Sequence, residues 1–77
     1  RKEAMFEAMM LGLRMNSGIS GTDFQRRFGT SIRSVYEAPL EQAVQNGLGL
    51  WTADGGYRLT TKGLLLENAV AVELMDV

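Results

Sequence analysis

The 77-residue sequence contains no cysteine and no histidine. Without thiols the chain has no disulfide framework, thiolate nucleophile or thiolate metal site, and without imidazole it lacks the commonest general base. The remaining carboxylates show no pairing or spacing that indicates general acid–base chemistry. We therefore expect no catalytic, cofactor-binding or metal-ligating residue in this chain.

Charge of one sign and long hydrophobic runs are also scarce. Eight basic and nine acidic residues leave a net charge of −1, too little to hold phosphate backbones or an anionic membrane surface. No apolar run approaches the roughly 20 residues that cross a bilayer, and no signal-peptide pattern opens the chain. We expect a cytoplasmic protein with no membrane contact.

The composition is that of a folded protein, with 45% hydrophobic residues. In the first half of the sequence the apolar residues recur with a helical period. The first predicted helix covers roughly residues 2–15. A second helix follows an N-cap at Ser20 and ends near Phe28, because Gly29 can adopt the left-handed conformation that closes a helix.

A third helix begins after Thr30 or Ser31 and continues to Asn46. Pro39 interrupts its pattern, because proline lacks the backbone donor and crowds the preceding turn. The sequence predicts a kink or a split near Glu37, unless Pro39 lies in the first turn of a restarted helix.

A small β-hairpin is predicted next, from residues 48–52 and 57–59, which are rich in strand formers. Asp54–Gly55 between them is the residue pair best suited to a two-residue type I′ turn. That turn would place Trp51 opposite Arg58, where the two side chains can stack as a cation–π pair.

Thr60 caps a last helix from Thr61 to about Met75. The predicted fold is thus mostly α with a small β-hairpin, in the order helix, helix, helix, β-hairpin, helix. This order is similar to a winged-helix module. A free-standing winged-helix module that binds nucleic acid or a protein partner therefore remains an alternative.

The third helix argues against nucleic acid as the partner. It offers Arg33 as a cation but also carries Glu37 and Glu41, which phosphates repel. The G-x-x-G from Gly18 to Gly21, which clamps nucleotides in one RNA-binding family, is short and common. We interpret it as a helix-to-helix turn.

Both terminal helices are apolar on more sides than a small one-sided core requires. In the first helix we expect Met5 and Met9 in the core and Met10 on a second apolar side. Gly12 in mid-helix costs about 1 kcal/mol against alanine, which indicates close packing there. Arg14 can bind a carboxylate or stabilise the helix C-terminus through its dipole.

The run from Glu7 to Arg14 is similar to the E-x-M-M-L-G-L-R signature that opens the C-terminal domain of the oxygen-independent coproporphyrinogen III oxidase family. Further matches in order and approximate spacing extend the resemblance over nearly the whole chain. They are Gly18, Ile19, Phe24, Phe28, Gly29, Leu40, Gly47, Leu48, Arg58, Leu59, Thr60, Gly63 and Asn68.

The resemblance implies that residues 1–77 are one C-terminal domain of a larger protein, a start at Arg1 being compatible with a processed chain or a fragment. The parent's N-terminal barrel would bind a [4Fe-4S] cluster and S-adenosylmethionine, and would be the partner of this domain. It also implies a tetrapyrrole in the full protein. We expect Met10, Gly12 and Arg14 to face the barrel or this substrate.

The family includes two functional classes, which the resemblance leaves open. Some members are similar to oxidases that convert coproporphyrinogen III to protoporphyrinogen IX in porphyrin biosynthesis. Their relatives resemble haem chaperones, which bind haem without that activity. In either case we expect the parent, rather than this fragment, to carry any oxidoreductase chemistry.

Overall fold

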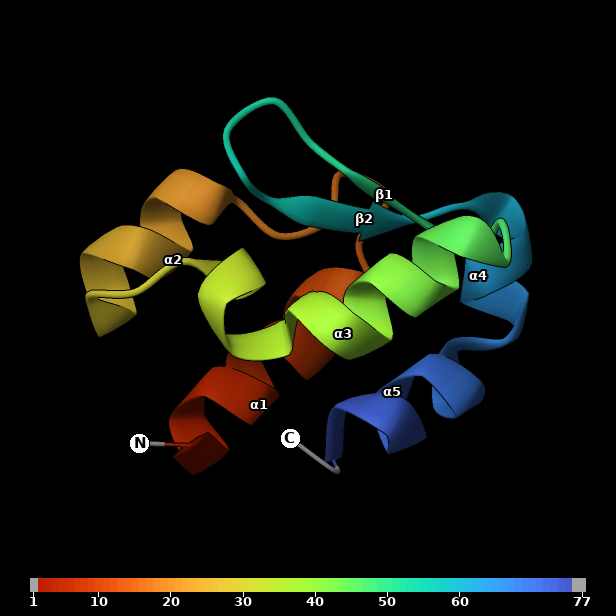
Figure 1. Ribbon diagram of the computed structural model, residues 1–77, viewed down its shortest axis with the longest axis horizontal. Coiled ribbons are helices and arrows are strands. Elements are labelled where there is room, and N and C mark those ends of the chain that lie inside the picture. Colours follow the sequence, from red (N-terminus) through yellow and green to blue (C-terminus); the bar gives the residue numbers. More distant parts are fainter. Residues whose placement is uncertain (1, 76–77) are drawn as a thin grey trace.

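Helices surround one β-hairpin in the computed structural model, which describes residues 2–75. This arrangement confirms the predicted fold class, mostly α with a small hairpin (Figure 1). In chain order the elements are α1 (Lys2–Leu13), α2 (Gly21–Phe28), α3 (Ile32–Gln45), β1 (Gly49–Trp51), β2 (Tyr57–Leu59), α4 (Thr61–Leu65) and α5 (Glu67–Met75).

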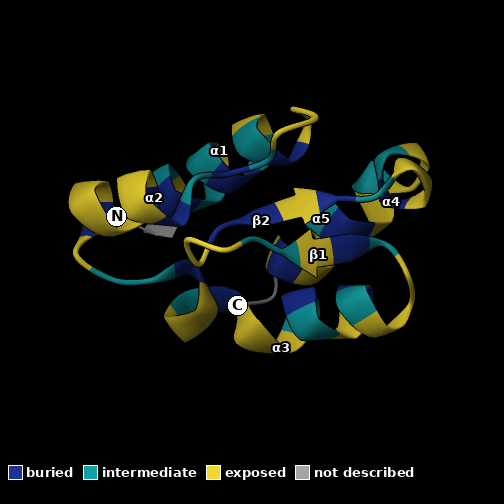
Figure 2. Cartoon of the chain, turned by 90° about the horizontal axis from the view of Figure 1, so that it is seen from above, coloured by how far each residue is buried: buried dark blue, intermediate teal, exposed yellow. Residues whose placement is uncertain are grey.

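The core lies where α1, α3, α5 and the hairpin meet, as the burial colouring in Figure 2 shows. α1 contributes Met5, Met9 and Leu13, which recur every four residues and form one buried stripe, as predicted. Val70 and Leu74 of α5 close the core from the other side.

The ends of α2 follow the local capping chemistry. Oγ of Ser20 accepts a hydrogen bond from the amide of Asp23 at 3.1 Å. Gly29 has φ of 73° and donates its amide to the carbonyl of Gln25. The predicted start and end of this helix are therefore confirmed.

A kink divides α3, as predicted from Pro39. Ser31 caps the helix, and Tyr36 leaves the helical conformation with φ of −122° and ψ of 21°. Pro39 lies three residues beyond this break, in the first turn of the second half, where its missing N–H has no helical partner to lose. The Tyr36 side chain at this kink lines a pocket together with residues of α1 and α5.

The hairpin is one residue out of the predicted register, and the two-residue type I′ turn is wrong. Trp51 pairs with Tyr57 and Leu50 with Arg58. The loop has three residues, closed by one hydrogen bond from the amide of Thr52 to the carbonyl of Gly56, and the amide of Gly55 donates to the carbonyl of Thr52. A type I′ turn needs positive φ at both central residues, but Gly55 has it and Asp54 does not.

The predicted stacking of Trp51 on Arg58 is also wrong, because the register carries Arg58 away. Arg33 of α3 lies over the indole instead, with its Cζ 4.1 Å from the ring centroid. Nε1 of Trp51 donates to Oε1 of Glu41 at 3.0 Å. Trp51 thus joins the hairpin to α3, while its ring also packs edge-to-face against Tyr57 of the neighbouring strand, with ring centroids 4.9 Å apart.

Tyr57 is the residue that joins the hairpin to both sides of the fold. Its backbone exchanges two hydrogen bonds with Ile19 in the α1–α2 connection, which adds a third extended segment beside β2. Its buried hydroxyl donates to the carbonyl of Leu40 at 2.9 Å. Gly49 is glycine because the Tyr57 ring occupies the space of a Cβ.

The predicted single last helix is two helices. Thr60 caps α4 as expected, accepting from the amide of Gly63 at 3.1 Å. Gly63 packs directly on the backbone carbonyl of Leu48, which fixes α4 against the end of β1. The chain breaks at Leu66, with φ of −114°, and this break allows α5 to pack on α1 and α3.

Candidate functional site

The residues predicted to face a larger partner lie on α1, but on two sides of it. Met10 is half-buried against the core, and Arg14 lies one turn further on the same side, its Nε 3.1 Å from Oε2 of Glu67. Gly12 lies opposite, against Ile19, whose side chain occupies the place of a Cβ. The close packing at Gly12 is confirmed, whereas contact of these three residues with a barrel or substrate stays a prediction.

Large apolar side chains are exposed at the end of α1 and along α4 and α5. Leu11 is 68% exposed, Leu65 81% and Met75 66%. Within residues 2–75 the large apolar side chains left exposed are Leu11, Met15, Leu50, Leu65, Leu66, Val72 and Met75. The expected excess of apolar surface on the terminal helices is therefore present.

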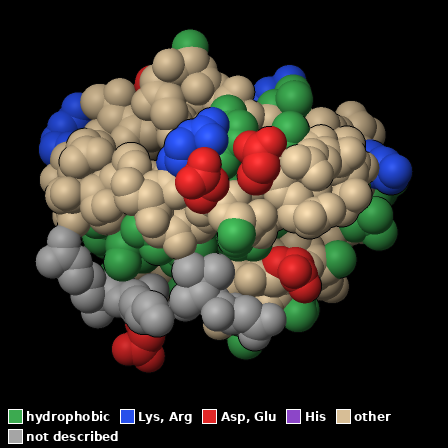
Figure 3. All heavy atoms as spheres, in the orientation of Figure 1, with side chains coloured by type: hydrophobic (Ala, Val, Ile, Leu, Met, Phe, Trp, Pro, Cys, Tyr) green, Lys and Arg blue, Asp and Glu red, His purple; other side chains and the backbone are tan. Residues whose placement is uncertain are grey.

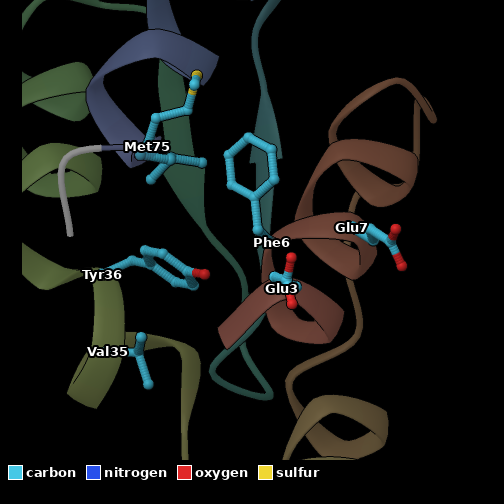
Figure 4. Close-up of a pocket in the computed structure, with 7 residues that line it drawn as sticks. Glu3, Phe6, Glu7, Val35, Tyr36 and Met75 are labelled. Atoms are coloured by element: carbon cyan, nitrogen blue, oxygen red, sulfur yellow. The ribbon is translucent and has the colours of Figure 1, made fainter. Parts of the chain in front are cut away.

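A pocket of about 550 Å³ opens between α1, α3 and α5 (Figure 4). Phe6, Val35, Leu74 and Met75 form its apolar walls. Glu3, Glu7 and Tyr36 add the polar groups. Its size and mainly apolar lining are typical of small-molecule sites.

Tyr36 is the central polar group of this pocket. Its ring is buried, with 3% of the residue exposed, and its hydroxyl points from α3 toward α1 in Figure 4. Within residues 2–75 this hydroxyl has no hydrogen-bond partner. Its oxygen is therefore open to the pocket, because no buried side-chain oxygen or nitrogen in this part of the chain lacks a partner. Burial raises the pKa of the Tyr36 phenol.

Sequence reasoning did not find this pocket. The kink near Pro39 was predictable, but the side chain that it turns inward was not. Phe6 belongs to the apolar pattern of α1 and gives no signal that separates a pocket wall from a core residue.

The N-terminus of α2 is occupied by the carboxylate of Asp54 from the hairpin loop. This carboxylate accepts hydrogen bonds of 2.8–3.3 Å from the Thr52 hydroxyl, the Ser20 hydroxyl and the amides of Gly21, Thr22 and Gly56. The hydrogen bond from Thr52 and then that from Thr22 hold the pKa of Asp54 well below its usual range.

Asp54 gives the G-x-x-G segment its role. Gly18 has φ of 79° and Gly21 begins α2, which confirms the segment as a helix-to-helix turn. The amides that would hold a phosphate at this helix N-terminus already bind a carboxylate. The sequence predicted Asp54 as a turn residue only, because its partners on α2 lie 32–34 positions away.

Basic side chains are dispersed and several are paired with carboxylates. Figure 3 shows Lys and Arg side chains in separate places on this face rather than in one stripe. Among residues 2–75 the ion pairs are Arg14–Glu67, Arg26–Asp23, Arg33–Glu37 and, at 4.0 Å, Arg33–Glu41. A nucleic-acid interface usually presents a basic patch. The absence of nucleic-acid binding stays a prediction.

The described part of the chain lacks a cluster of side chains suited to a metal ion. Residues 2–75 contain no group of three or more His, Cys, Asp or Glu side chains that could hold a metal ion. A [4Fe-4S] cluster is held by cysteine thiolates, and this sequence has none. The residues present therefore do not fit such a cluster.

Among residues 2–75, the helices are too short or too polar for a membrane span.

Comparison with known proteins identifies the family to which the chain belongs. The family model described as HemN C-terminal domain matches residues 1–66. The protein named heme chaperone HemW from Bacillus subtilis (strain 168) is 32% identical over 69 residues, which are 90% of this chain and 18% of that relative. The chain thus spans less than a fifth of the relative's length, and no solved structure gives a significant match. Because the family model covers most of the sequence, the resemblance noted from its residues is confirmed, and the chain belongs to the HemN C-terminal domain family.

Proposed function

We propose that this domain is the accessory C-terminal module of a HemN-family protein, in which it packs on the catalytic barrel and helps to enclose a tetrapyrrole. The observation that carries the proposal is the excess of apolar surface on the terminal helices. Leu65 and Val72 are exposed to solvent, although Val70 and Leu74 of the same segment are buried in the core. A second apolar side of this kind needs a covering partner.

The energy available from this surface is sufficient for docking. Full burial of one large aliphatic side chain contributes about 1.5–3 kcal/mol. Leu65, Val72 and Met75 are each more than half exposed, so several such contributions remain unused in the domain alone. Part of this sum offsets the entropy lost on association, which a covalently linked partner keeps small.

Arg14 is the residue that we propose to meet a tetrapyrrole carboxylate. Its pair with Glu67 is largely exposed on the Arg14 side, and such surface pairs contribute at most about 1 kcal/mol. Exchange of Glu67 for a propionate therefore costs little. The half-buried Met10 on the same side of α1 supplies an apolar neighbour for a porphyrin ring.

Of the two family activities, the named relative favours the haem chaperone. The oxidase that converts coproporphyrinogen III to protoporphyrinogen IX is the other candidate for the parent. In both cases a [4Fe-4S] cluster and S-adenosylmethionine would be held by the barrel, since this chain has no cysteine. We place the parent in the cytoplasm.

The proposal that this domain packs on the barrel is tested by dividing the parent protein into two pieces. The 77-residue chain and the remaining part of its parent polypeptide are purified separately, and their association is measured by isothermal titration calorimetry. We expect binding by the unchanged chain and loss of binding for L65E/V72E. The control L50E places one such charge on an exposed apolar residue of the hairpin, and we expect it to bind normally.

The tetrapyrrole part is tested by haem titration of the reassembled protein, followed at the Soret band. Arg14→Gln is compared with Arg26→Gln, since both arginines are exposed and paired with one carboxylate. We expect weaker haem binding for the first variant alone. If Arg14→Gln and Arg26→Gln bound haem with equal affinity, Arg14 would be removed from the proposal. If L65E/V72E bound the remaining part of the parent as tightly as the unchanged chain, the packing role would be overturned.

A further inference from the structure

The pocket between α1, α3 and α5 has a chemistry that the proposed function does not use. Its floor is apolar, formed in part by Phe6 and Leu74, and the free Tyr36 hydroxyl enters it. Because the ring is buried and the hydroxyl is open to the pocket, a ligand that enters can form a hydrogen bond with it in place of water. The pocket therefore combines an apolar surface with one fixed polar anchor.

The rim of this pocket is acidic. Glu3 and Glu7 lie on consecutive turns of α1 and both line the opening, whereas no basic residue is among the described residues that line it. In Figure 4 Glu3 lies on the helix that faces the Tyr36 hydroxyl, and the Glu7 carboxylate points outward. The Glu3 charge at this rim attracts a cation and repels the carboxylates of a tetrapyrrole.

We infer that this pocket binds a small amphipathic cation, an apolar ring or short chain that carries a protonated amine. The apolar part lies against Phe6 and Leu74. The ammonium donates a hydrogen bond to the hydroxyl oxygen of Tyr36 and is attracted by the carboxylate of Glu3. This inference does not rest on the proposed function, because its ligand has the opposite charge; the two surfaces share Met75, which lines the pocket and is also exposed on α5.

The test is a titration of the ¹⁵N-labelled 77-residue chain followed by ¹H–¹⁵N NMR. The probes are 2-phenylethylammonium, the neutral 2-phenylethanol and the anionic phenylacetate, which have the same ring and similar length. Ligands of this size bind with dissociation constants on the order of millimolar. We expect shifts at the amides near Phe6, Tyr36 and Leu74, with the amine bound about fivefold more tightly than the alcohol.

Three single substitutions separate the contributions. Glu3→Gln is expected to weaken the amine about two- to fivefold while leaving the alcohol unchanged. Tyr36→Phe weakens both, since both lose the hydroxyl contact. The control Glu73→Gln removes an exposed carboxylate of α5 that does not line this pocket, and it leaves the amine affinity unchanged.

Several results would overturn the inference. They are the absence of shifts up to about 20 mM amine, shifts confined to another part of the chain, phenylacetate binding as tightly as the amine, and an unchanged amine affinity in Glu3→Gln. Because the titration uses this chain alone, these results are distinct from a failure of docking or haem binding in the two-piece protein.

Discussion

Removing one oxygen atom from Tyr57 tests how the hairpin is held to the helices. The Tyr57 side chain is fully buried, and its hydroxyl donates to the carbonyl of Leu40 at 2.9 Å. Loss of such a hydrogen bond lowers the free energy of unfolding by about 0.5–1.5 kcal/mol. In a domain of this size 1 kcal/mol corresponds to about 4–8 °C in Tm, so Tyr57→Phe is expected to lower Tm by several degrees.

The control is Tyr36→Phe, because the Tyr36 ring is also buried, with 3% of the residue exposed, but its hydroxyl has no partner within residues 2–75. We expect this variant to unfold within about 0.5 kcal/mol of the unchanged chain. Both variants are measured by urea and thermal unfolding, followed by circular dichroism. Equal stability of Tyr57→Phe and the unchanged chain, or an equal loss in Tyr36→Phe, would refute the reasoning.

The same hydroxyl predicts a dependence on alkaline pH. Burial, and then the negative charge of Glu41, hold the pKa of Tyr57 well above its usual range. A raised pKa in the folded state means that stability is complete below the unfolded pKa of about 10 and falls as the pH rises above it. Tyr57→Phe is expected to lose part of this alkaline dependence.

Three further predictions concern other contacts. Gly63→Ala is expected to lower the free energy of unfolding by about 1–3 kcal/mol, because a Cβ meets the carbonyl of Leu48; urea denaturation measures it. Asp54→Asn is expected to lower the free energy of unfolding at neutral pH and to reduce the further loss of stability in acid. The depressed pKa of Asp54 means that its stabilisation is present above the unfolded pKa of about 3.9 and is lost as the pH falls below it. Unfolding is measured across the acid range, and an equal loss of stability in both proteins would contradict this prediction. The chain alone is expected to self-associate weakly at millimolar concentration and Val72→Glu to do so less, by light scattering; a strict monomer would count against the exposed apolar surface.

The sequence predicts those parts of the fold that depend on neighbouring residues. Ser20, Ser31 and Thr60 cap their helices because the side-chain acceptor and the backbone donor lie three residues apart. The kink in α3 follows from Pro39 for the same reason, since its missing donor acts within one turn.

The hairpin register could not be predicted, because its cause is distant in the sequence. Asp54–Gly55 favours a two-residue turn when taken alone. In the fold the Asp54 carboxylate binds the first amides of α2, and the loop takes three residues to present it there. The register then moves by one, and Trp51 meets Arg33 instead of Arg58.

The candidate site was predictable in part. The apolar surplus on the terminal helices follows from their sequence periods, and it is present in the structure. That Gly12 and Arg14 lie on different sides of α1 could be read from helical geometry. The pocket around Tyr36 could not, since three helices distant in the sequence form its walls.

Hydrogen exchange, followed by mass spectrometry, tests the central claim most directly. The amides of residues 61–75 and 8–15 are compared between the 77-residue chain alone and the same segment within its complete parent protein. If the parent covers the exposed apolar sides of α1, α4 and α5, these amides exchange more slowly in the complete protein, while the hairpin loop at Asp54 is little changed. Equal exchange of residues 61–75 and 8–15 in both proteins would contradict the account.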